Sequence, residues 1–170
     1  MKKYLLVVCL TLISSLCVQG QNNLNIPKGV PTDFEKSFTF PLGSKILIEL
    51  KENTNGSYDY KVLKIENIED YYSLDEDKNL FDAKPKEDTV ELYFMGAYYN
   101  DGSKDSDWKT VLILRNNSKK HINYKADIKY YYSDIFENTS IVGAFPGTNT
   151  TEIWAHKIDF ITLYDFKNFK

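Results

Sequence analysis

The chain has 170 residues, of which 42% are hydrophobic and 26% are charged, and its net charge at pH 7 is −3. This balance offers no concentrated basic surface, so the sequence predicts no nucleic-acid partner. Arg115 is the only arginine, which excludes an arginine cluster that binds phosphate or carboxylate groups in a bidentate manner.

The first 20 residues have the features of a secretory signal peptide. Lys2 and Lys3 precede a mostly apolar run over residues 4–16, and Val18-Gln19-Gly20 offers a cleavage point before Gln21. The apolar run is shorter than the roughly 18–20 residues that span a bilayer. We therefore expect a secreted or periplasmic protein that keeps no transmembrane segment after cleavage.

A lipid anchor on Cys17 is the alternative, although Ser14 and Leu16 fit a lipoprotein signal poorly. Both cysteines, Cys9 and Cys17, lie in the leader, so the mature chain is expected to have no disulfide, thiol nucleophile or thiolate metal site. Without the leader, 19 basic and 24 acidic side chains remain, which gives a net charge of −5.

Residues 21–36 contain three Pro or Gly residues and little periodic pattern, which indicates an extended lead-in to a single domain over residues 37–170. Ser37–Phe40 is a candidate edge strand. Residues 46–65 predict a hairpin, because apolar and polar side chains alternate on both sides of a turn at Asn53–Gly56. The alternation changes phase after Val62, which predicts a β-bulge there.

Residues 66–86 are acidic and do not follow a strand pattern. Ser73-Leu74-Asp75-Glu76 matches a capping box, and Leu74, Leu80 and Phe81 could seat a short helix that ends before Pro85. We expect the acidic side chains of this segment to face solvent.

The stretch from Trp108 to Tyr132 has the strongest strand pattern. Residues 111–114 are apolar on both faces, which is typical of a strand covered on both sides. Residues 122–130 alternate regularly, with apolar side chains on one face. Asn116-Asn117-Ser118 predicts a turn between the two strands, so we expect a central hairpin.

Further strands are expected at Thr89–Met95, at Thr139–Gly143, and over Ile158–Leu163, which should be central because it is apolar on both faces. Tyr98–Asp107 is expected to be a loop. Seven or eight short strands predict an all-β fold, an antiparallel two-sheet sandwich of immunoglobulin-like type with one short helix. A small β-barrel is the alternative.

The stretch RNNSKKHINYKADIK resembles the late hairpin of immunoglobulin-like bacterial extracellular domains. In that pattern an apolar strand ends in Asn-Asn, here Asn116 and Asn117, and the chain returns through Tyr-x-Ala, here Tyr124 and Ala126. Together with NTSIVGAFPG and EIWAHKIDFITLYDF, residues 108–169 resemble small secreted β-sandwich proteins of Bacteroidota-type bacteria. The resemblance implies a fold and brings no catalytic residues with it.

No residue pattern assigns an activity. His121 and His156 are the only histidines and have no metal-ligand spacing, and no nucleophile elbow or phosphate-binding glycine loop occurs. We predict a non-enzymatic binding or interaction module with an unknown protein or glycan partner. The alternative is a carbohydrate-binding module or a small carbohydrate-active hydrolase. That would require coplanar exposed rings and, for hydrolysis, two carboxylates roughly 5–10 Å apart.

Two sets of side chains are candidates for a site. Asp101, Asp105 and Asp107 could supply oxygen ligands to Ca²⁺, although turn chemistry also explains them; no other cofactor is expected. Runs of adjacent tyrosines should place at least one ring of each run outside the core, because neighbouring strand residues point to opposite faces. Exposed rings are suited to binding sugars or proteins, and cross-strand pairing is the alternative. The candidate ligand-binding residues are Tyr98, Tyr99, Trp108 and Tyr131.

Overall fold

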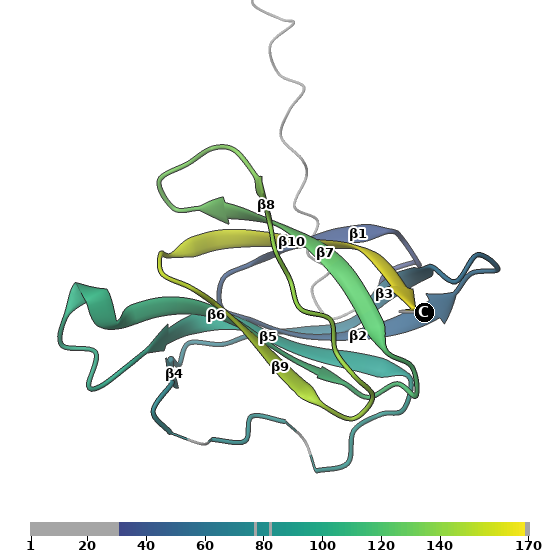
Figure 1. The fold of residues 1–170 in the computed structure, drawn as a ribbon, viewed down its shortest axis with the longest axis horizontal. Coiled ribbons are helices and arrows are strands. Elements are labelled where there is room, and N and C mark those ends of the chain that lie inside the picture. Colours follow the sequence, from purple (N-terminus) through teal and green to yellow (C-terminus); the bar gives the residue numbers. More distant parts are fainter. Residues whose placement is uncertain (1–30, 77, 82, 169–170) are drawn as a thin grey trace, which may run out of the picture.

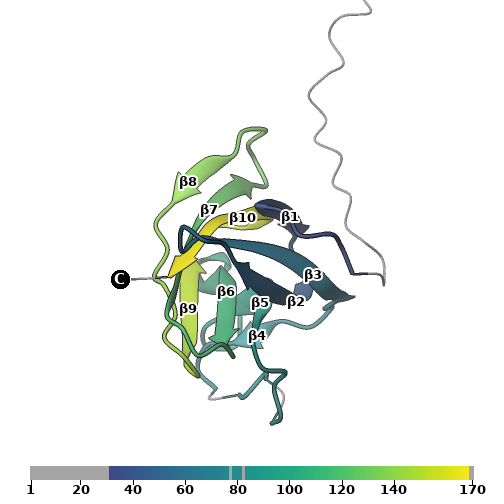
Figure 2. The same ribbon diagram turned by 90° about the vertical axis from the view of Figure 1, so that its right-hand side faces the viewer.

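The computed structural model describes residues 31–76, 78–81 and 83–168. The predicted signal peptide, Cys17 and most of the lead-in lie outside these residues. The described chain folds into two β-sheets packed face to face (Figures 1 and 2). The sheets do not close into a barrel, so the predicted two-sheet sandwich is confirmed.

The smaller sheet has the order β1 (Ser37–Pro41), β10 (Ile158–Asn168), β7 (Ile122–Tyr130) and β8 (Glu137–Thr139). The larger sheet has the order β3 (Tyr58–Asn67), β2 (Ser44–Glu52), β5 (Thr89–Tyr98), β6 (Trp108–Asn116) and β9 (Asn149–Trp154). All these pairs are antiparallel, and the short β4 (Tyr72–Ser73) runs parallel to the end of β5. The sandwich therefore consists of two layers, and neighbouring strands within a layer are often not consecutive in the chain.

The main core lies between the two sheets and follows the predicted alternation. In β7 the buried side chains are Ile122, Tyr124, Ala126 and Ile128. Leu112 of β6 belongs to the same buried cluster. Burying one such aliphatic side chain contributes roughly 1.5–3 kcal/mol. The alternating pattern of β7 thus specifies which of its faces is buried.

A second core covers the outer face of the larger sheet. Val111 and Ile113 of β6 point away from the main core and form a buried cluster there, together with Phe81, Tyr93, Met95 and Ala97. The chain between β3 and β5 packs on this cluster through Ile68, Tyr72, Leu74 and Leu80. The prediction that β6 is covered on both faces is confirmed.

The segment that supplies this cover contains no helix in its described residues, so a helix at residues 73–81 is a wrong prediction. Ser73 ends β4, and the Leu74 amide donates to the Tyr98 carbonyl oxygen (2.8 Å). Pairing with the edge of β5 satisfies main-chain groups that a first helical turn would leave free. Among the described residues the one short helix is the 3₁₀ turn η1, which lies instead at Asp105–Asp107.

β6 and β7 do not form the expected hairpin, because they belong to different sheets. The connection crosses the sandwich and is held by Asn116, whose side chain is completely buried. Its Nδ2 donates to the carbonyl oxygens of Lys120 (2.8 Å) and Ala144 (3.0 Å), and its Oδ1 accepts from the Ser118 amide (3.0 Å). A turn sequence fixes a reversal of the chain, but it does not fix which strand becomes the neighbour.

Other strand predictions are confirmed or corrected by the pairing. In the β2–β3 hairpin Leu47 faces Lys64 while Ile48 faces Val62, so the predicted bulge is confirmed, with Leu63 as the extra residue. β10 is central between β1 and β7, as expected. The strand expected at residues 139–143 is found earlier, as β8, and β9 was not predicted because its Thr-rich edge is half exposed.

Tyr60 joins the two sheets at one side of the core. Its buried hydroxyl donates to the Leu163 carbonyl oxygen of β10 (2.7 Å) and accepts from the Phe38 amide of β1 (2.7 Å). The main chain of Tyr60 also exchanges hydrogen bonds with Glu35 (2.9 Å each), so the lead-in covers the outer edge of β3. A covered edge cannot pair with a strand of another chain.

Candidate functional site

The β5–β6 hairpin projects beyond the start of β10 at one end of the sandwich (Figure 1). In this hairpin Phe94 pairs with Leu112, Gly96 with Thr110, and Tyr98 with Trp108. Strand alternation puts these residues on the face that the smaller sheet covers further along. The core face of the larger sheet therefore continues past the smaller sheet and becomes open.

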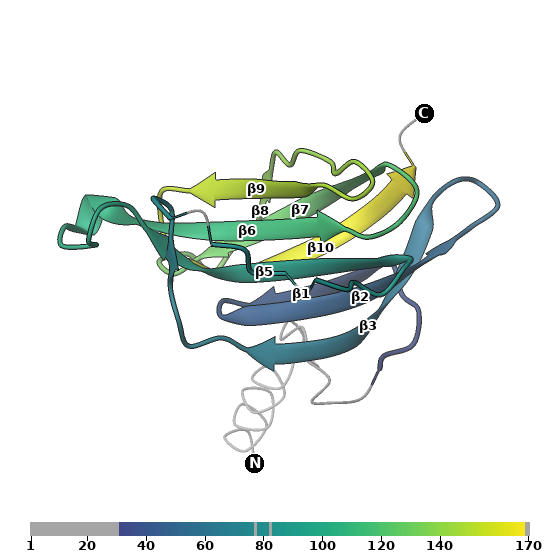
Figure 3. The same ribbon diagram turned by 90° about the horizontal axis from the view of Figure 1, so that it is seen from below.

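β6 begins and β9 ends at this end of the larger sheet (Figure 3). An open groove of about 530 Å³ is lined by residues from this region. We call it the aromatic groove. It is lined by Tyr71, Trp108, Tyr131 and His156, by the polar side chains of Asp105, Lys109, Thr110 and Lys157, and by Leu42, Gly96 and Ala155. Its volume lies within the range of roughly 300–1,000 Å³ that small-molecule sites occupy.

Trp108 lines one wall of the groove and is 38% exposed. Its Nε1 donates to the Gly102 carbonyl oxygen (3.0 Å), and its ring centroid is 5.5 Å from that of Tyr98. Gly102 has a φ of +68°, and a Cβ there would lie 3.2 Å from the indole. The glycine therefore provides both the turn geometry and the room for the indole.

Tyr71 is 59% exposed and is nevertheless fixed in place. Its ring lies over Gly96, where a Cβ would come within 2.7 Å of a ring carbon. The ring centroid is 4.9 Å from that of Trp108, with an interplanar angle of 77°. The neighbouring Tyr72 packs on the second core, so this tyrosine pair sends one ring out of the core, as predicted.

The opposite wall comes from the end of β7 and the β9–β10 connection. The Tyr131 and Tyr132 rings are 5.0 Å apart at 84°, and the Tyr130 and Tyr132 rings stack at 5.3 Å. The His156 ring lies 6.2 Å from both Tyr130 and Tyr132. Burial and the nearby Tyr132 hydroxyl raise the pKa of Tyr130. Lys157 Nζ forms a salt bridge with Asp159 Oδ1 (3.3 Å).

The loop between β5 and β6 is held by its own carboxylates. Asp107 accepts from the Lys104 amide (3.2 Å) and from Asn100 Nδ2 (3.3 Å). Asp101 accepts from the Ser103 amide (3.1 Å), and hydrogen bonds from Ser103 lower the pKa of Asp101. In the described part of the chain no three His, Cys, Asp or Glu side chains gather as metal ligands. The geometry gives the calcium hypothesis for Asp101, Asp105 and Asp107 no support.

Of the four candidate binding residues, two line the aromatic groove and two do not. Trp108 and Tyr131 line the aromatic groove, and Tyr98 supports Trp108 from beneath without lining it. Tyr99 is 36% exposed and lies outside the lining. Sequence reasoning did not select Tyr71, which joins the site through the non-local contact with Gly96; its only signal was its place in a tyrosine pair.

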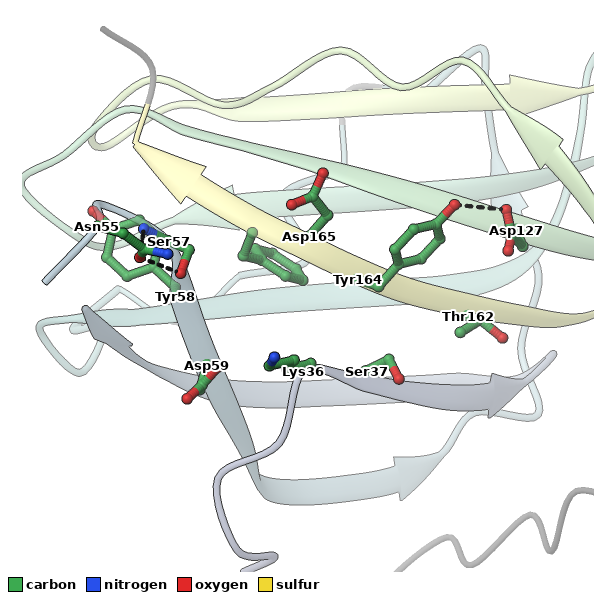
Figure 4. A pocket seen from close by; sticks show the side chains of 11 residues that line it. Lys36, Ser37, Asn55, Ser57, Tyr58, Asp59, Asp127, Thr162, Tyr164 and Asp165 are labelled. Atoms are coloured by element: carbon green, nitrogen blue, oxygen red, sulfur yellow. Dashed lines mark hydrogen bonds between the residues drawn. The ribbon is translucent and has the colours of Figure 1, made fainter. Parts of the chain in front are cut away.

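A second hollow, of about 580 Å³, lies between the outer face of the smaller sheet and the start of β3 (Figure 4). There Tyr164 donates to Asp127 Oδ1 (3.0 Å), and Asn138 Nδ2 donates to the same oxygen (3.0 Å). Burial and the Asp127 bond raise the pKa of Tyr164. Asp59, Asp127 and Asp165 stand apart around the hollow rather than facing one another (Figure 4), so their arrangement does not suggest a pair of catalytic acids.

Comparison of the chain with models of protein families, with curated proteins and with solved structures gives no match. Across the described ranges up to Asn168, no helix is long and apolar enough to cross a membrane. The function is therefore inferred from the side chains of the sites themselves.

Proposed function

We propose that the protein is a non-enzymatic binding module, exported to the periplasm or the cell exterior, and that the aromatic groove is its ligand site. The observation that carries this proposal is the position of Tyr71. A ring with 59% of its surface in water gains little stability from burial, yet it is seated on Gly96 and against Trp108. A site held in this way loses little conformational entropy when it binds a ligand.

The hydrogen bonds of Thr110 in the groove favour a structural role for its hydroxyl over group transfer. A nucleophilic hydroxyl needs an adjacent base to accept its proton. Thr110 Oγ1 instead donates to the His156 carbonyl oxygen (3.1 Å) and accepts from the Ile158 amide (3.1 Å). Both of these bonds join main-chain groups of the β9–β10 connection, so the hydroxyl serves to position that wall.

The test is a glycan and peptide array probed with three forms of the mature protein: wild type, Trp108→Ala and Tyr99→Ala. Trp108 and Tyr99 have nearly equal exposure, 38% and 36%, but only Trp108 lines the groove. We expect Trp108→Ala to lose binding and Tyr99→Ala to keep it, with circular dichroism showing that both remain folded. If both variants bind as well as wild type, the ligand site lies elsewhere. Turnover of any arrayed glycan would overturn the proposal that the protein is not an enzyme.

A further inference from the structure

We infer that the ligand of the aromatic groove is a neutral pyranose sugar, bound as a short oligosaccharide or as the end of a longer chain. This inference rests on the proposed binding function and names the chemical class of the ligand. A pyranose ring has C–H groups on its faces and hydroxyl groups around its rim. A site for such a sugar therefore combines an aromatic ring beneath the sugar face with polar groups beside its hydroxyl groups. The lining of the aromatic groove has both kinds of side chain.

The angles between the rings indicate a chain end rather than the middle of a chain. Tyr71 and Trp108, which both line the groove, meet at 77°, so these two rings are not the coplanar pair expected of a flat carbohydrate-binding surface. A flat polysaccharide surface would require coplanar rings at successive units. Nearly perpendicular rings form a corner instead, in which one ring lies under a sugar face and the other closes its side.

The charges around the groove favour a neutral sugar. Asp105, Lys109 and Lys157 line it together, so both signs of charge are present. The Lys157 ammonium is 3.3 Å from Asp159, and the Lys109 ammonium donates to the carbonyl oxygens of Ser106 and Trp108. These contacts reduce the attraction of the two lysines for an anion, while leaving donors and acceptors at the rim for hydroxyl groups.

The two aromatic walls suit more than one sugar unit. Trp108 begins β6 of the larger sheet, and Tyr71 directly precedes β4. Tyr131, on the other wall, directly follows β7 of the smaller sheet. A ligand that contacts both walls must cross the opening between the sheets. The groove volume of about 530 Å³ suits a small ligand and sets a limit on how many units contribute to affinity.

The experiment is calorimetric titration of the mature protein with neutral oligosaccharides of one to about six pyranose units. The parent polysaccharides, an acidic oligosaccharide and a proline-rich peptide are titrated in parallel. We expect at least one neutral series to bind, with an affinity that stops increasing after about two or three units. Tyr131→Ala should weaken binding about tenfold or more, as removal of an anchoring ring does.

Phe145→Ala is the matched control, since Phe145 is 62% exposed, Tyr131 is 59% exposed, and only Tyr131 lines the groove. This variant should bind within about twofold of wild type. Gly96→Ala is a second probe, because its methyl group would displace the Tyr71 ring without removing any side chain. We expect this variant to stay folded and to bind several-fold more weakly.

The outcomes separate the inference from the proposed function. Binding of the proline-rich peptide alone, or of the acidic sugar alone, would overturn the neutral sugar and leave the binding function standing. Affinity that keeps rising with chain length would overturn binding at a chain end. Sugar binding that is unchanged in both Tyr131→Ala and Gly96→Ala would overturn this groove as the site. A protein that binds none of these ligands would lose the support for both proposals.

Discussion

Asn116 should be one of the most sensitive positions in the chain, because its side chain holds the crossing between the two sheets. Asn116→Ala removes the donor to Lys120 and Ala144 and the acceptor for Ser118. A hydrogen bond contributes about 0.5–1.5 kcal/mol net, and a buried group left without a partner costs more, so we expect a loss of about 2–4 kcal/mol. Urea unfolding followed by circular dichroism measures it.

Asn117→Ala provides the control within the same turn. Asn117 is only half buried, and its Nδ2 makes a long 3.4 Å bond to Thr89 Oγ1. We expect its loss of unfolding free energy to stay below about 1 kcal/mol. Equal and small losses at both positions would refute the view that the Asn116 side chain holds the crossing.

A third variant tests the direction of the Asn116 hydrogen bonds. Asn116→Asp keeps the shape but replaces the donor with an oxygen that faces the carbonyl groups of Lys120 and Ala144. Burial and these oxygens raise the pKa of the new carboxyl group above its unfolded value of about 3.9. Relative to wild type, the added loss therefore begins near that pH and grows as pH rises towards the folded-state pKa. A pH-independent loss would contradict this assignment of the amide.

Four further outcomes are expected. Tyr60→Phe should lose about 1–3 kcal/mol in urea unfolding, because two buried main-chain groups lose their partner. Leu112→Ala should lose about 2–5 kcal/mol through the cavity it leaves, and a smaller loss would mean that the face of β6 is misassigned. Lys125→Ala should change the free energy of unfolding very little, because an exposed ion pair contributes little. The hydrogen bond from Lys125 lowers the pKa of Asp165, so this small cost should be present above about pH 3.9 and vanish as pH falls. Calcium or a chelator should leave the melting temperature of the mature protein unchanged, and a calcium-dependent rise would restore the metal hypothesis.

The features that the sequence predicted are those that depend on near neighbours in the chain. The alternation of β7, the two apolar faces of β6 and the extra residue Leu63 in the β2–β3 hairpin each leave a local mark in the pattern of side chains. The separation of β6 and β7 into different sheets involves instead contacts between distant parts of the chain, such as the pairing of β6 with β5 and β9 and the bond between Asn116 and Ala144. A contact between residues so far apart leaves no periodic pattern that could be read from the sequence.

The same division applies to the candidate site. Trp108 and Tyr131 could be selected because Trp108 begins β6 and Tyr131 follows β7, two strands whose side-chain pattern is clear in the sequence. Tyr71 could not be placed, because its position depends on the missing Cβ of Gly96 in another strand. The chain between β3 and β5 that packs on the second core, the covering segment (residues 68–81), has a sequence that predicts a helix, because its few apolar residues fit a helical spacing as well as they fit contact with that core.

The covering segment and the sandwich beneath it should differ in the free energy that is needed to open them. It rests on a cluster separate from the main core, and few main-chain bonds join it to the rest of the chain: the short pairing at β4, the Leu74 amide on the Tyr98 carbonyl oxygen, and the Ile68 amide on the Gly43 carbonyl oxygen (2.7 Å). Such a segment can open as a unit while the sandwich stays folded, with a free-energy cost below that of global unfolding. Because Tyr71 lies in this segment, each opening would also take apart one wall of the groove. A bound ligand would then slow amide hydrogen exchange in residues 68–81 more than in β7 or β10, and occupancy would be reported by a part of the chain that mostly does not touch the ligand.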